Sequence, residues 1–309
     1  MTRVAAVDLG TNSTRLLVAD VEDGRVEEVA RRLAITRLGE GVDRRRRLLP
    51  VAIARVRNCL TDYRRELERL GAERTLAIAT SAVRDAENGE AFLGEIEWSY
   101  GFDTRLLSGD EEAALTLRGV THGRELAAGT VVVDIGGGST ELIAAGFRTS
   151  LDVGCVRLTE RFLASDPPAR DELDACAAAV RELLPDATFT AAIGVAGTIS
   201  TIAALDLGLE RFDAERVHGH RISRAAADAQ LARLSSLPLA ERRLVPALEP
   251  ERAPVIVAGT VILREVMTRY GLDEIEESEH DILLGAALAA AELPALAEGD
   301  APPGAYTCC

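Results

Sequence analysis

The sequence predicts an α/β fold built from two related domains, and two observations lead to this. The stretch DLGTNSTRL at residues 8–16 returns as DIGGGSTEL at residues 134–142. Each stretch joins two apolar runs that read as the strands of a hairpin, and helical patterns follow both hairpins. A duplication of this kind predicts two copies of one unit, with their glycine-rich turns facing a shared cleft.

The first half predicts three strands and then alternating helices and strands. Strands are expected at residues 3–10, 13–21 and 25–39. They are followed by a helix at residues 50–70 that ends at Gly71, a strand at residues 76–80, a helix at residues 90–100 and a strand at residues 103–107. The run SGDEEAALTLRGV then predicts a helix with Ser108 as its N-cap and acids in its first turn.

After a break at residues 122–129 the strand pattern begins again. Strands are expected in TVVVDIG, STELIAAG, SLDVG and FTAAIGVAG, helices at about residues 156–163 and 171–184, and a mostly helical chain from residue 199 to Leu296. We therefore expect an N-terminal domain of residues 1–123 and a C-terminal domain of residues 124–309 with added helices.

Composition restricts the possible functions. The 309 residues are 47 % hydrophobic and carry a net charge of −15, which argues against broad nucleic-acid binding but not against binding a small polyanion. The chain has no lysine, so all 35 basic residues are arginine. This excludes a Walker A lysine and a Schiff base, so any anion must be held by arginine, backbone N–H groups or a metal.

The sequence further predicts a soluble cytoplasmic protein without a membrane partner. A strand begins at once, which leaves no room for a signal peptide, and the apolar runs are too short to span a bilayer. The five cysteines form no C-x-x-C pair, and no role is assigned to the terminal Cys308 and Cys309.

The two glycine-rich turns are expected to bind phosphate. Glycine lets backbone N–H groups converge on an anion, and the neighbouring hydroxyl and amide side chains add donors. The candidate phosphate ligands are Thr11, Asn12, Ser13 and Arg15 in the first turn, and Gly136, Gly137, Gly138 and Ser139 in the second. Arg15 either binds phosphate or points away by strand alternation.

Acids beside these donors predict a cation. Asp8 and Asp134 precede the two turns, and a carboxylate repels phosphate unless Mg²⁺ or Mn²⁺ lies between them. Glu141 stands where the first turn has Arg15, and it could hold a metal or a water. The alternative for Glu141 is a solvent-facing strand residue.

Ordered motifs along almost the whole chain resemble the Ppx/GppA family of exopolyphosphatases and guanosine pentaphosphate phosphohydrolases. They are DLGTNSTRL, ITRLGEGVD, ATSAVRDAEN, LSGDEEA, DIGGGSTEL, GCVRLTERF, GVAGTISTIAAL, RVHGHRI, VIVAGTVILREVM and SEHDILLGAA. The resemblance implies two actin-like ATPase domains (the ribonuclease H-like fold of the actin, sugar kinase and Hsp70 superfamily) facing a central cleft, and it makes a homodimer the expected assembly.

The resemblance also implies roles for particular residues. Glu112 in LSGDEEA matches the proposed general base, with a dipole-favoured helix acid as the alternative, and Arg84 in ATSAVRDAEN matches a phosphate ligand, with a surface pair to Asp85 as the alternative. Asp134 and Glu141 match the acids that hold metal and water, and Asp8 matches the first loop. Arg157 and the histidines of VHGH receive no role, and the histidines are interpreted as structural.

The expected activity is release of terminal orthophosphate from inorganic polyphosphate by metal-assisted attack of water, catalysed by Glu112 and Glu141. The family's extra C-terminal module is missing, so short chains are the expected substrate, and the basic run at residues 44–47 is either a solvated loop or a contact to a polyanion. Guanosine pentaphosphate hydrolysis is the alternative, although only 4 % of residues are aromatic and could cradle a base. A kinase of the same superfamily and a non-catalytic sensor of phosphate or alarmone are further alternatives.

Overall fold

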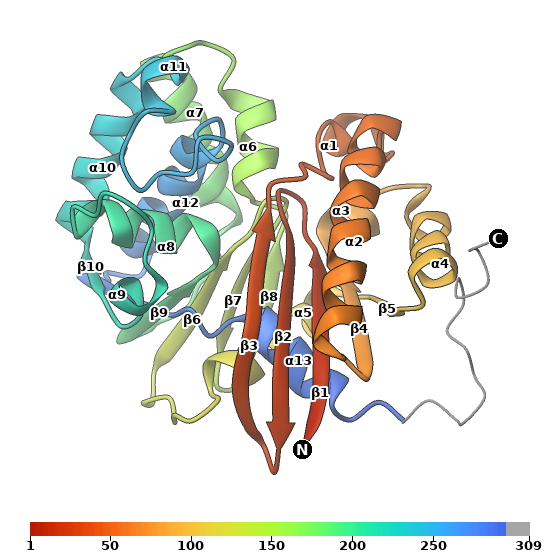
Figure 1. Ribbon diagram of the computed structural model, residues 1–309. Coiled ribbons are helices and arrows are strands. Elements are labelled where there is room, and N and C mark those ends of the chain that lie inside the picture. The colour runs from red at the N-terminus through yellow and green to blue at the C-terminus, as the bar shows by residue number, and fades with distance from the viewer. Residues whose placement is uncertain (295–309) are drawn as a thin grey trace. The chain divides into compact units, whose positions relative to one another are not determined.

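The computed structural model describes residues 1–294, and the chain divides into two compact units (Figure 1). Among the described residues, unit 1 combines residues 1–119 with residues 282–294, and unit 2 contains residues 120–281. The expected boundary at residue 123 is close to the observed boundary between residues 119 and 120. The expected second domain also contained residues 282–294, which belong to unit 1 in the structure. Cys308, Cys309 and Leu296 lie outside the described residues.

Unit 1 is a mixed sheet with helices on both faces. Its elements are β1 (Thr2–Leu9), β2 (Thr14–Glu22), β3 (Arg25–Ala34), α1 (Val42–Arg45), α2 (Pro50–Leu70), β4 (Arg74–Ala79), α3 (Ser81–Arg84), α4 (Gly89–Tyr100), β5 (Asp103–Leu106), α5 (Gly109–Val120) and α13 (Ile282–Ala290). The strand order is β3-β2-β1-β4-β5. β1, β2 and β3 pair antiparallel, whereas β4 and β5 run parallel to β1.

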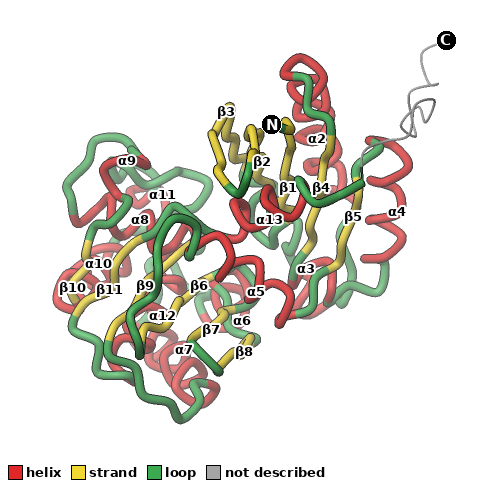
Figure 2. Tube along the Cα trace, turned by 90° about the horizontal axis from the view of Figure 1, so that it is seen from below, coloured by secondary structure: helices red, strands yellow, loops and turns green. Residues whose placement is uncertain are grey.

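The side chains of the strands in unit 1 point alternately to the two faces of the sheet, and both faces are apolar. One face, with Val7 and Leu16, packs against α2 and α4. The other face, with Val4, Leu17 and Ile78, packs against α13, which contacts β1, β2 and β4 (Figure 2). Every residue of α13 is buried, so this helix is apolar all round, and that explains why it leaves the second half of the chain to cover the first sheet.

Unit 2 repeats the same plan and extends it. Its elements are β6 (Thr130–Ile135), β7 (Thr140–Ala144), β8 (Phe147–Leu151), α6 (Cys155–Phe162), α7 (Arg170–Leu183), β9 (Ala191–Val195), α8 (Ala196–Asp206), α9 (Ala214–Val217), β10 (Arg221–Ser223), α10 (Arg224–Ser236), α11 (Leu239–Arg242), α12 (Ile256–Arg269) and β11 (Glu274–Glu277). The strand order is β10-β11-β9-β6-β7-β8.

Without β10, the order in unit 2 matches that of unit 1 strand for strand, from the antiparallel hairpin to the parallel pairs. This confirms the predicted pair of actin-like domains. β10 and β11 were missed, because the chain beyond residue 199 was expected to be mostly helical. The sequence of β11 is EIEE, and acidic residues have low strand propensity, but Ile275 faces the core and β9 and β10 flank it on both sides.

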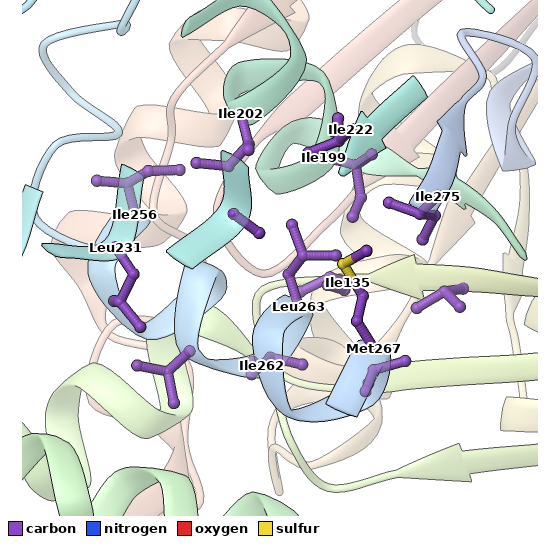
Figure 3. Close-up of a cluster of buried hydrophobic side chains, with 14 of the residues drawn as sticks. Ile135, Ile199, Ile202, Ile222, Leu231, Ile256, Ile262, Leu263, Met267 and Ile275 are labelled. Atoms are coloured by element: carbon purple, nitrogen blue, oxygen red, sulfur yellow. The ribbon is translucent and has the colours of Figure 1, made fainter. Parts of the chain in front are cut away.

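The core of unit 2 lies between its sheet and the helices α8, α10 and α12. Ile135, Ile199, Leu263, Met267 and Ile275 meet there (Figure 3). Strands β6, β9 and β11 contribute Ile135, Ala192 and Ile275 to this core, and loops continue from the ends of these strands.

Candidate active site

The two glycine-rich loops fold into the same turn. The first loop, residues 10–13, joins β1 to β2, and the second loop, residues 136–139, joins β6 to β7. Gly10 N donates to Ser13 O at 3.0 Å, and Gly136 N donates to Ser139 O at 3.0 Å. Both loops follow the carboxyl end of a central strand, where parallel neighbours also end, and in α/β sheets this is the usual place for a ligand.

In the second loop the carbonyl groups are held from one side by the start of α6. Cys155 N donates to Gly136 O at 3.0 Å and Val156 N donates to Gly137 O at 2.8 Å. The buried Arg157 donates through Nε to Gly138 O at 2.7 Å. In a trans peptide the C=O and the following N–H point in opposite directions, so the N–H groups of Gly137, Gly138 and Ser139 face away from α6. Consecutive N–H groups aligned in this way form an anion-binding concavity.

In the first loop the carbonyl groups are held by residues 37–39. Gly39 N donates to Thr11 O at 2.8 Å, and Arg37 N donates to Asn12 O at 2.9 Å. The N–H groups of Asn12 and Ser13 therefore point away from residues 37–39. Residues 37–39 belong to ITRLGEGVD, one of the motifs that resemble the family. In the structure this motif supports the first glycine-rich loop.

The predicted ligands in the two loops are mostly enclosed. Thr11, Asn12 and Ser139 are buried, and Ser13 is half-buried. The Thr11 hydroxyl lies 2.8 Å from the hydroxyl of Ser81, the first residue of α3, so the side chain of Thr11 anchors its loop while its peptide group remains part of the cradle.

Strand register places two pairs of predicted residues opposite each other. Asp8 pairs with Arg15 across β1 and β2, and Asp134 pairs with Glu141 across β6 and β7. In the first pair, Arg15 Nε and Nη2 contact Asp8 Oδ2 at 2.9 and 2.8 Å, so the guanidinium of Arg15 is directed at Asp8.

The second pair brings together two acids instead. Asp134 is 6 % exposed and Glu141 is fully buried, so the solvent-facing alternative for Glu141 is wrong. Ser150 Oγ donates to Glu141 Oε1 at 2.6 Å and fixes its orientation.

Two buried carboxylates on directly opposed strand positions fit a hard divalent cation such as Mg²⁺, because like charges repel in a low dielectric and carboxylate oxygens are its preferred ligands. Among residues 1–294 no cluster of three or more Asp, Glu, His or Cys side chains could hold a metal. Mg²⁺ commonly retains several waters and binds through one or two carboxylates and substrate phosphates, so a two-acid site is sufficient for it.

The predicted base and the predicted phosphate ligand of unit 1 contact each other. Arg84 Nη1 donates to Glu112 Oε2 at 3.2 Å and to Leu107 O at 2.7 Å. Glu112 is 7 % exposed, so it is not a solvated helix acid. The surface alternative for Arg84 is not observed either, because Asp85 lies instead 3.9 Å from Arg46.

The first turn of α5 fixes Glu112 in place. Ser108 and Glu111 form a reciprocal cap, in which Glu111 N donates to Ser108 Oγ at 3.3 Å and Ser108 N donates to Glu111 Oε2 at 2.8 Å. Hydrogen bonds from the backbone and hydroxyl of Ser108 lower the pKa of Glu111. The predicted N-cap is confirmed, and Glu111 is the acid that stabilises the helix end, which leaves Glu112 for the Arg84 contact.

Several residues that support the site were not assigned from the sequence. Arg157 was left without a role, although it holds the second loop. Gly39 and Gly154 pack against the loops so closely that a Cβ would lie 2.3 Å from the Thr11 side chain and 2.4 Å from the Gly137 backbone. The histidines that were interpreted as structural have protein partners, which fits that interpretation: His220 Nε2 lies 2.7 Å from Asp206 Oδ2, and His218 Nδ1 accepts from Glu279 N at 3.1 Å.

Within residues 1–294, none of the helices combines the length and apolar character that crossing a bilayer requires. The model of the Ppx/GppA phosphatase family matches residues 17–283. Exopolyphosphatase 2 of Mycobacterium tuberculosis is 40 % identical, over 94 % of this chain and 99 % of the relative.

Two further comparisons extend this result. A guanosine-5'-triphosphate,3'-diphosphate pyrophosphatase of Vibrio atlanticus is 32 % identical over 88 % of this chain, which spans only 56 % of that relative. The crystal structure of an exopolyphosphatase-like protein superposes with a TM-score of 0.87 at 34 % identity, covering 93 % of this chain and 98 % of the other.

Proposed function

Since the chain belongs to the Ppx/GppA phosphatase family, we propose that it is an exopolyphosphatase that hydrolyses the terminal phosphoanhydride bond of inorganic polyphosphate. The observation that carries this proposal is the orientation of the two glycine-rich loops. In each loop the carbonyls are hydrogen-bonded on one side, so the N–H groups are free to receive phosphoryl oxygens on the other. Each cradle suits a phosphoryl group, the unit that polyphosphate repeats.

In the proposed reaction, water attacks the terminal phosphorus in line with the leaving phosphate oxygen. Glu112 accepts a proton from that water, and the shortened polyphosphate leaves. Arg84, which holds Glu112 in the structure, presents its remaining N–H groups to the phosphoryl oxygens. The N–H groups of the loops stabilise the negative charge that spreads over those oxygens.

We assign Asp134 and Glu141 to Mg²⁺, with Mn²⁺ as the alternative, on the fit of the buried acid pair. When bound, the cation would neutralise phosphate charge beside these carboxylates. Glu141, fixed by Ser150, is the second acid that we propose as catalytic. Asp8 remains a candidate ligand of the cation. Because Arg15 forms an ion pair with Asp8, we propose that Arg15 serves to neutralise Asp8 in preference to binding phosphate.

Guanosine pentaphosphate is the second candidate substrate, because the Vibrio relative is named for hydrolysis of that nucleotide. Polyphosphate is favoured by the greater identity and the full-length match to the mycobacterial exopolyphosphatase. We further propose short chains as substrate, a homodimer as the assembly and the cytoplasm as the location, following the family resemblance.

The test is phosphate release by the purified protein in the presence of Mg²⁺. Short polyphosphate, long polyphosphate, guanosine pentaphosphate and ATP are compared as substrates, each with Glu112→Gln as the matched control. Release that falls by about 10²–10⁴-fold in Glu112→Gln supports the proposal, because that is the usual contribution of a general base.

Two results would contradict it. Near-wild-type turnover in Glu112→Gln would remove Glu112 from the mechanism. Binding of polyphosphate without release from any substrate would favour the sensor alternative, and transfer of phosphate to an added acceptor would favour a kinase.

A further inference from the structure

A contact between two helices of unit 1 reaches the proposed base. α5 carries Glu112 in its first turn, and α13 lies beside α5 (Figures 1 and 2). A Cβ added to Gly285 of α13 would lie 1.9 Å from the carbonyl oxygen of Leu115 and 2.8 Å from its carbonyl carbon. The two helix backbones therefore touch at this point, and only a glycine permits so close an approach.

Two independent contacts join α5 to this part of the chain. The Leu115 side chain packs against the apolar cluster that contains Leu283 and Ala287 of α13. One turn further along α5, Arg118 makes a two-pronged ion pair with Glu292, in the turn that follows α13, at 2.6 and 3.2 Å. The position of α5 is thus set along its length by α13 and the turn after it, and at its start by Ser108 and Arg84.

The contact lies on the same side of α5 as the base. Residues 112 and 115 are three apart, so they occupy one face of the helix. Any displacement at Leu115 is passed to Glu112, because a helix of this length moves as a rigid rod over one turn. We infer that Gly285 is a positioning residue for the reaction: it lets α13 seat α5 so that the Glu112 carboxylate reaches the attacking water. This inference rests on the role proposed above for Glu112.

The change that tests it is Gly285→Ala. Restoring a normal contact distance requires a shift of about 1 Å, and the obstacle is backbone, which cannot rotate away. A misplacement of about 1 Å typically costs up to about 10²-fold in rate. We expect kcat to fall by about 10- to 100-fold with KM within about twofold, since the phosphate cradles are unaffected. Gly94→Ala is the matched control, because Gly94 lies within helix α4 of the same unit and its added Cβ would meet nothing within 4 Å.

The double variant Glu112→Gln/Gly285→Ala separates positioning from general damage. If Gly285 acts through Glu112, the second substitution causes no further loss of kcat in the Glu112→Gln background. A loss of equal size in both backgrounds would overturn the inference, and so would a folded Gly285→Ala protein with wild-type kcat or with a changed KM alone. Circular dichroism and the thermal midpoint establish that each variant is folded at the assay temperature.

If Gly285→Ala does not fold, Arg118→Ala decides the question, because the Arg118–Glu292 pair is exposed and its loss is mild. The expected result is a fall in kcat of about two- to fivefold at constant KM, absent in the Glu112→Gln background. Wild-type kcat in Arg118→Ala would then overturn the inference. Full turnover in Glu112→Gln itself is a different failure, because it removes the proposed base and not only its support.

Discussion

Replacing Gly154 by alanine tests how the second glycine-rich loop is held. Gly154 precedes α6 and has φ −145, which any residue can adopt, so the substitution introduces no backbone strain of its own. Its Cβ, however, would lie 2.4 Å from the carbonyl carbon and oxygen of Gly137 and 2.5 Å from the carbonyl carbon of Gly138. Something must move by at least about 0.6 Å, and every atom in the way belongs to the loop backbone.

Gly154→Ala should lower both the stability of the protein and its affinity for polyphosphate. Overpacking of this kind lowers the free energy of unfolding by about 1–3 kcal/mol. A hydrogen bond to a charged group contributes about 1.5–3 kcal/mol. Loss of one aligned N–H group to phosphate would therefore weaken polyphosphate binding by about 10- to 100-fold.

The assay is isothermal titration of polyphosphate into Glu112→Gln with and without Gly154→Ala, so that turnover does not consume the ligand. Gly94→Ala in the same background is the control and should bind like its parent. Unchanged affinity in a folded Gly154→Ala protein would refute the reasoning that α6 aims the N–H groups of the loop.

Three further predictions follow from the charges. Mg²⁺ at about 100 times its Kd should raise the free energy of unfolding of the wild type by about 2.7 kcal/mol, and with it the thermal midpoint. In Glu141→Gln this rise should largely disappear. An equal rise in the variant would exclude Glu141 as a ligand. Burial, together with the charge of Glu279, raises the pKa of Glu277 to about 9, so its contribution to stability is complete below about pH 4.5 and is lost as pH rises toward 9. Glu277→Gln should therefore lose less stability than wild type between about pH 5 and 9 in urea titrations, and parallel profiles would contradict this. The four arginines of residues 44–47 are exposed beside the α3–α4 turn, where Glu87 N donates to Arg46 O at 2.8 Å. Their replacement by serine should raise KM more for long polyphosphate than for short polyphosphate. A KM that the replacement leaves unchanged at every chain length would show that these residues are a solvated loop.

The duplicated hairpin was predictable from sequence because its signals are local. The alternating strands and the glycine turn of each hairpin are adjacent in sequence, and both hairpins form as expected. The helix from Pro50 to Leu70 also ends at Gly71 as predicted, since Gly71 adopts a left-handed conformation and donates to the last carbonyls.

The supports of the site were not predictable, because they come from segments distant in sequence. Nothing in the local pattern of Gly39 or Gly154 shows which backbone each one touches. Arg15 could bind phosphate or point away on sequence grounds, and only the strand register shows that it faces Asp8. An all-apolar segment such as α13 predicts burial without naming its partner, and its place on the first sheet depends on the completed fold.

That place of α13 has a consequence for the order in which the protein can be made. Unit 2 is continuous in sequence and can condense as soon as it leaves the ribosome, whereas unit 1 lacks the cover for Val4, Leu17 and Ile78 until residue 290 has been synthesised. The first domain to be translated is therefore the last to be finished. A chain that stops at Asp281 would present an uncovered apolar sheet face to chaperones and to other nascent chains, although all residues of the first hairpin are present.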